Sequence, residues 1–187
     1  MNDYHPTLWR TCRILANARR LACLKAVIDN PGSSVGEIAE QLHLPMDKAS
    51  LSLRALQSRG LLQAQRFSRW VRYQPCPDPL IPGSASLLAA LQNQLKRGRI
   101  PEKEICRILT GFTHPRRLLI LLHLQQNGEL SSDTLAAKTR ISPPALWRHL
   151  NKLKVRGLVV ETESGWRLCS TPPPLAKALL CILATSP

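Results

Sequence analysis

The sequence has 187 residues, 44% of them hydrophobic, which is enough for one large domain or two small ones with buried cores. It carries 26 Lys and Arg against 12 Asp and Glu, a formal net charge of +14, and this excess favours a polyanionic partner, with nucleic acid the first candidate. No apolar run approaches the about 20 residues of a membrane-spanning helix and the N-terminal residues are unlike a secretory leader, so we expect a cytoplasmic protein with no membrane partner.

The first part of the chain predicts a series of short helices. Apolar residues at helical spacing predict helices over 8–15 and 19–29, and Asn30-Pro31-Gly32 ends the second. Ser34 and Glu37 have the spacing of a capping box, in which each side chain satisfies backbone donors at the start of a helix. A short third helix therefore begins after Ser34.

A longer helix and a hairpin follow. The pattern predicts a helix over 46–58, and Gly60 suits the left-handed conformation that ends many helices. Alternating apolar and polar residues then predict two strands, 61–65 and 70–74. A closing helix is expected over 85–95. The order is helix, tight turn, helix, hairpin and closing helix.

The second part of the chain repeats the first. A constant offset of 97 residues aligns Arg19–Leu62 with Arg116–Val159, and the two segments share 12 identities in 44 positions. Arg59-Gly60-Leu61 thus matches Arg156-Gly157-Leu158. A repeat of this length and regularity indicates an internal duplication.

The second copy predicts the same elements in the same order. Its hairpin strands are expected over 158–162 and 166–169, and its closing helix over 175–183. The predicted fold is mainly α with small β-hairpins, divided into two tandem domains, 1–98 and 99–187.

This order of elements resembles the winged-helix domain of the ArsR-type (arsenical-repressor-like) bacterial transcription regulators. The resemblance covers most of the chain and rests on 34–42, Leu53, Leu56 and 59–62 in the first copy, and on Leu135-Ala136, 141–150, Leu153 and 156–158 in the second. It implies two tandem winged-helix domains that bind double-stranded DNA sequence-specifically and regulate transcription. Because such regulators are usually homodimers joined through their first and last helices, it also implies self-association through these helices, here as an intramolecular pseudo-dimer.

The second helix-turn-helix places DNA-reading side chains on one face. At 100° per residue, Leu146, Leu150 and Leu153 form its buried side. The opposite side holds Arg148, Asn151, Lys152 and Val155. Arg pairs with guanine edges, Asn with adenine, and Lys with phosphate or guanine, so this face predicts major-groove binding, with a solvated basic face as the alternative. His149 lies on the flank, where packing against neighbours explains it at least as well as a base contact.

The first copy predicts fewer contacts from its helix and more from its hairpin. Leu51 takes the place of Arg148, and an exposed Leu can contact a thymine methyl group or a protein. The candidate DNA-binding residues here are Lys48, Arg54, Arg66, Arg69 and Arg72. The second hairpin instead carries Glu161 and Glu163, which phosphates would repel. The two copies have therefore specialised.

Other classes of function lack matching residues. None of the six cysteines forms a CxC or CxxC pair, so we expect small buried side chains and no metal site or cofactor. No phosphate loop, Ser/His/Asp set or carboxylate pair is visible, and we expect no enzymatic activity. Aromatic residues at 4% are too few for stacking single-stranded nucleic acid. The main alternative is a tandem winged-helix protein-interaction module, like the adaptors of chromosome-segregation complexes, which Leu51 and the acidic second hairpin favour.

Overall fold

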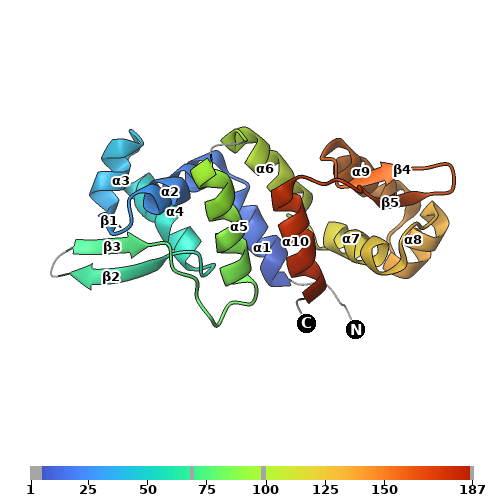
Figure 1. Ribbon diagram of the computed structural model, residues 1–187, viewed down its shortest axis with the longest axis horizontal. Helices are drawn as coiled ribbons and strands as arrows, with labels where there is room; N and C mark the ends of the chain where they lie inside the picture. The colour runs from blue at the N-terminus through green and yellow to red at the C-terminus, as the bar shows by residue number, and fades with distance from the viewer. Residues whose placement is uncertain (1–5, 68–69, 98–99, 186–187) are drawn as a thin grey trace. The chain divides into compact units, whose positions relative to one another are not determined.

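The computed structural model describes residues 6–67, 70–97 and 100–185, and it is mainly helical with small antiparallel sheets (Figure 1). Its internal contacts divide the chain into two compact units. The first unit is Ile14–Cys106, and the second unit combines the residues up to Arg13 with Arg107–Pro187. Each unit contains a helix-turn-helix followed by a hairpin.

The units differ from the predicted domains 1–98 and 99–187 in two short segments. Residues 6–13 of the first helix group with the second unit, and residues 100–106 group with the first. Contacts group a helix with the elements that it packs against, whereas the predicted domain boundaries follow the place of each helix in the repeat. The domain boundaries themselves stay a prediction.

The first unit forms its helix-turn-helix where the sequence predicted it. The elements are α2 (Ala18–Asp29), β1 (Ser33–Ser34), α3 (Val35–Gln41), α4 (Met46–Gln57), β2 (Gln63–Phe67), β3 (Trp70–Gln74) and α5 (Ser84–Arg97); α1 (Pro6–Leu15) and α6 (Glu102–Gly111) extend into both units. The capping box is confirmed: the Glu37 N–H donates to Ser34 Oγ at 3.3 Å, and the Ser34 N–H donates to Glu37 Oε2 at 2.7 Å.

The hairpin of the first unit belongs to a three-stranded antiparallel sheet in the order β1-β3-β2 (Figure 1). Strand β3 has its predicted bounds, whereas β2 begins two residues later than predicted. Strand β1 was not predicted, and it pairs Ser33 with Tyr73 and Ser34 with Arg72. The sheet thereby joins the hairpin to the residues that begin α3.

The second unit repeats this order of elements. They are α7 (Pro115–Asn127), α8 (Ser132–Thr139), α9 (Pro143–Val155), β4 (Val159–Glu161), β5 (Trp166–Leu168) and α10 (Pro174–Thr185). The turns correspond in detail, because His43 and Arg140, which are 97 residues apart, have positive φ angles of 51° and 53°. Gly60 and Gly157 likewise have φ angles of +65° and +68°. Both units thus make the same turn inside the helix-turn-helix and the same turn after it.

Each unit has its own apolar core. In the first, α2 packs on α3 and α4, and Leu24, Ile38 and Leu53 are fully buried. In the second, α7 packs on α8 and α9, and Leu121 and Leu135 are fully buried. These cores fix the outward faces of α4 and α9, the two helices that carry the predicted contacts.

The cysteines only partly follow the sequence-based expectation. Cys12 and Cys23 are buried, and burial raises the pKa of both thiols, so they behave as small apolar side chains. The expectation is wrong for the other four, because Cys76, Cys106 and Cys169 are half-buried and Cys181 is exposed. No helix in the described ranges is long and apolar enough to cross a membrane.

Candidate nucleic-acid interface

Helix α9 is built to hold one face in the core and one face outside. It begins at Pro143, whose fixed φ and missing N–H suit the first turn of a helix. The side chains of Leu146, Leu150 and Leu153 are no more than 2% exposed. This apolar stripe packs on α7 and α8 and fixes the rotation of the helix.

The opposite face of α9 carries the polar side chains that the sequence predicted there. Arg148 and Lys152 are exposed and Asn151 is half-buried. Val155 on the same face is 71% exposed. The structure therefore brings Arg148, Asn151 and Lys152 together on one surface, where guanidinium, amide and ammonium groups are available as donors.

Two arginines tie α7 and the end of α9 to the C-terminal turn of α6. The Arg117 guanidinium donates to the Gly111 and Thr110 carbonyl oxygens at 2.8 and 2.9 Å and to Thr113 Oγ1 at 2.8 Å. Burial and the charge of Arg156 lower the pKa of Arg117 to about 10, so it stays charged at neutral pH. Arg156, directly after α9, donates from Nε to Thr110 Oγ1 at 2.6 Å. Both guanidinium groups thus bind the C-terminal turn of α6.

Two histidines meet between α7 and α9. His114 is the N-cap of α7, and its Nδ1 accepts from the Arg116 N–H at 3.1 Å. The centroids of the His114 and His149 rings lie 4.7 Å apart, with 46° between the ring planes. Burial, followed by the charge on His114 and on nearby Arg and Lys side chains, lowers the pKa of His149 to about 4. The pKa of His114 is also lowered, chiefly by burial, and both rings are neutral at pH 7.

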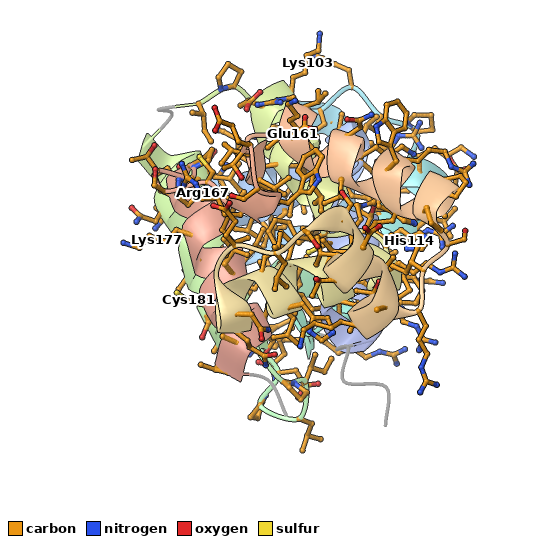
Figure 2. The ribbon with its side chains drawn as sticks, turned by 90° about the vertical axis from the view of Figure 1, so that its right-hand side faces the viewer. Lys103, His114, Glu161, Arg167, Lys177 and Cys181 are labelled. Carbon is orange, nitrogen blue, oxygen red and sulfur yellow. The ribbon has the colours of Figure 1, made fainter. Side chains whose placement is uncertain are left out.

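A cavity of about 300 Å³ opens beside this pair. Its polar lining consists of His114, Arg116, Arg117, Arg148, His149 and Lys152, which we call the basic pocket. Figure 2 shows His114 on the opposite side of the second unit from Lys177 of α10. Because Arg148 and Lys152 belong both to the pocket and to the predicted DNA-reading face of α9, the basic pocket continues this face onto α7.

The carboxylates at the second hairpin differ in their surroundings. Glu161 Oε2 lies 2.7 Å from Nζ of Lys154, a residue of α9. The same Nζ lies over the Trp166 ring, 5.8 Å from its centroid. Glu129 accepts hydrogen bonds from Ser164 and Thr162, and these bonds lower the pKa of its carboxyl group. Glu163 is exposed at the turn.

The candidate residues on α4 lie on a mixed surface. Arg54 is exposed and lines a second cavity, of about 470 Å³, together with Cys76 and Asp78. Lys48 is exposed, and its Nζ lies 3.3 Å from Asp47 Oδ2. Leu51 is 60% exposed, and Met46 at the start of the helix is 59% exposed. The α4 face thus combines charged and apolar side chains.

The three arginines of the first hairpin differ in their surroundings. Arg66 on β2 is exposed. Arg72 on β3 donates from Nη1 to the Gly32 carbonyl oxygen at 2.9 Å, and its charge helps to lower the pKa of Glu37 after the hydrogen bonds from Ser34. Arg69 lies outside the described residues. Arg72 is therefore tied to the β1 end of the sheet, whereas Arg66 has a free approach from solvent.

Sequence reasoning did not select three residues that the structure adds to the interface. His114, Arg116 and Arg117 lie about 30 residues before α9, and only folding brings them to Arg148 and Lys152. The signal available was the Arg-Arg pair at the head of each repeat. Its position at the start of a helix did not reveal which residues it would face.

Comparison with known proteins supports a nucleic-acid interface in the second unit. Residues 114–160 match the family model described as winged helix-turn-helix DNA-binding. The match runs from His114 through α9 into β4, and so includes both sides of the basic pocket. No curated protein sequence matches the chain. Within the described residues, no group of three or more His, Cys, Asp or Glu side chains is placed to hold a metal ion.

Proposed function

We propose that this protein is a sequence-specific double-stranded DNA-binding transcription regulator. One observation carries the proposal: Arg148, Asn151 and Lys152 share the outward face of α9, within the segment that matches a DNA-binding winged helix-turn-helix family. Arg and Asn can make bidentate contacts to guanine and adenine, and Lys can hold phosphate. The net charge of +14 supports a polyanionic partner.

The finer proposal concerns how the chain is organised on DNA. The 97-residue repeat and the matching turns at His43 and Arg140 support two winged helices that arose by duplication. In ArsR-type regulators two such units come from two chains. We infer that this chain supplies both, as an intramolecular pseudo-dimer that acts in the cytoplasm by binding rather than by catalysis.

Selection of bound fragments from random duplex DNA tests the function. The wild-type protein should enrich a defined sequence at both low and moderate salt. Arg148→Ala should then weaken binding to that sequence by about 1 to 3 kcal/mol and relax the preference at one base pair. Lys177→Ala is the matched control, because it also removes one exposed positive charge from the second unit but lies on α10, away from His114 (Figure 2).

Two outcomes would contradict the proposal. Failure to enrich any duplex, with a folded protein, would exclude sequence-specific DNA binding. An equal loss of affinity for every duplex on Arg148→Ala would show that this residue contacts the backbone and does not read bases.

A second candidate function rests on the first unit. Met46 and Leu51 are both more than half exposed, and exposed apolar side chains can join a protein contact. A protein-interaction module would use this surface to bind a protein partner. A chain that shifts no DNA fragment, and whose Leu51→Glu variant loses a partner, would favour this function.

A further inference from the structure

The basic pocket has the chemistry of an anion site. Arg116, Arg117, Arg148 and Lys152 line it from two helices. The charges that act on His114 are those of Arg117, Arg116, Lys152 and, from α1, Arg13. All are positive, and no carboxylate lines the described pocket. An anionic group such as a phosphate would therefore be surrounded by positively charged side chains.

One buried polar atom in this region has no hydrogen-bond partner among the described residues. The Nδ1 atom of His149 is buried and makes no hydrogen bond to any described residue. Leaving a buried polar atom unpaired is costly, and such atoms in native structures are few. By contrast, Nδ1 of His114 accepts from the Arg116 N–H, so the neutral His114 ring carries its proton on Nε2. His149 is therefore the ring that can accept a proton without breaking the cap of α7.

The first unit shows that the fold does not require these side chains. With the 97-residue offset, Asn17 corresponds to His114, and its Oδ1 caps α2 by accepting from the Arg20 N–H at 3.1 Å. Ser52 corresponds to His149, and it donates to the Lys48 carbonyl oxygen inside the helix. Arg148 and Lys152 correspond to Leu51 and Ala55. The same helices thus form without the imidazole pair and without the two cations of α9.

We propose that the basic pocket holds one phosphate group of the DNA backbone, and that His149 takes up a proton when this phosphate arrives. The proposal rests on the proposed function, since it assigns a partner group and a pH response to the same interface. In the free protein, burial, together with the surrounding positive charges, keeps both rings neutral. A bound phosphate brings negative charge next to them, compensates these cations and favours the imidazolium form. The protonated ring then donates to a phosphate oxygen or strengthens the field that holds it.

The sign of the pH effect follows from linkage. The pKa of His149 is about 4 in the free protein and is higher in the complex, so binding takes up a proton. Affinity should therefore rise as pH falls. If phosphate restores the pKa of His149 to about its ordinary value of 6.5, Kd should fall about tenfold between about pH 7.5 and 5.5, and a smaller restoration should give about threefold.

The test measures binding of the full-length chain to a duplex selected as above, at constant ionic strength across this pH range. Wild-type protein should bind more tightly at low pH by the stated factor. His149→Gln keeps a polar side chain of similar reach but cannot titrate, and should lose the pH response. His114→Asn keeps a side chain that can cap α7, as Asn17 caps α2. This variant shows whether the pH response depends on the neighbouring imidazole ring. His123→Gln removes an imidazole elsewhere on α7 and should retain the wild-type pH response. Circular dichroism at each pH confirms that every variant is folded.

Duplexes that each carry one neutral methylphosphonate identify the phosphate. At one position, and not at the others, substitution should abolish the pH response of the wild-type protein. A pH response that persists in His149→Gln, or at every methylphosphonate position, overturns the proposal while leaving DNA binding intact. If inorganic phosphate alone protonates His149 in NMR spectra and the duplex does not, the pocket serves a free phosphate and the proposal is wrong. Absence of any binding at every pH would instead count against the proposed function.

Discussion

Arg117 shows how a buried positive charge is accommodated without an acidic partner among the described residues. Three of its hydrogen bonds end on oxygen atoms at or just after the C-terminal turn of α6, where helix carbonyl groups lack partners within the helix. This end of a helix is also the negative end of its dipole. The guanidinium therefore satisfies the helix end, and its residue is one of those that line the basic pocket.

His149 should make the stability of the second unit depend on pH. Its pKa is lowered to about 4 in the folded protein, against about 6.5 in an unfolded chain, so folding favours the neutral ring. The stabilising contribution is complete above about pH 6.5 and is lost progressively as pH falls towards 4. Urea unfolding at about pH 7 and pH 5 should therefore show a lower free energy of unfolding at pH 5, before most carboxylates titrate.

The His149→Gln variant is the control for this effect. It should lose less stability than the wild-type protein over the same pH interval, because its side chain has no proton to gain. A wild-type protein whose free energy of unfolding is constant between these pH values would contradict the lowered pKa of His149. An undiminished loss in the variant would assign the effect to another group, such as His114.

Elements whose signals are local were predictable from the sequence. The capping box of Ser34 and Glu37 predicted the start of α3, and alternating residues predicted β3 with its exact bounds. The outward face of α9 also followed, because periodicity fixes which side of a helix is buried. Strand β1 did not, since two residues carry no pattern and become a strand only by pairing with Tyr73 and Arg72.

The basic pocket was beyond sequence reasoning for a similar reason. His114 and His149 are separated by 35 positions, and nothing in either local sequence states that their rings meet. Their contact depends on how α7 and α9 pack. Arg72 illustrates the converse, because its charge suggested a free phosphate contact but its guanidinium is bound to the Gly32 carbonyl oxygen.

The two glycines that follow the helix-turn-helix elements offer a matched prediction. Gly60 and Gly157 have nearly the same positive φ, which costs an alanine about 1 to 2 kcal/mol. A Cβ at Gly157 would meet nothing within 4 Å, whereas one at Gly60 would lie 2.8 Å from the Asp78 Cβ. Gly60→Ala should therefore lower the free energy of unfolding by about 1 to 3 kcal/mol more than Gly157→Ala, since overpacking adds to backbone strain.

Chemical denaturation of both variants measures this difference. The probe should follow each unit separately, for example by amide hydrogen exchange of residues in α4 and α9. Equal losses in the two variants would mean that the loop containing Asp78 moves away at little cost, and that it does not constrain the end of α4.

At the scale of the whole molecule, the two units present different chemistry on the same framework. The helix face of the second unit is cationic and continues into the basic pocket, whereas the α4 face combines Arg54 with exposed Met46 and Leu51. The hairpins differ in the opposite sense, since β2 offers Arg66 and the second hairpin pairs Glu161 with Lys154. Two such unlike surfaces in one chain favour an asymmetric binding site over a palindrome.

Salt dependence should reveal how much of the chain contacts DNA. If about six phosphates are neutralised, log K should fall against log salt with a slope of about −5, because each neutralised phosphate releases condensed counterions. Lys152→Ala should reduce the magnitude of this slope by about 1, and Lys177→Ala should leave it unchanged. Titrations of one duplex at four or more salt concentrations measure the slope, and sedimentation of the complex gives the number of chains bound.

One chain per asymmetric site with the full slope would indicate that both units engage the duplex. Two chains on a palindrome would contradict the pseudo-dimer, and a slope near −2 would mean that only about two phosphates are neutralised, too few for contact by both units.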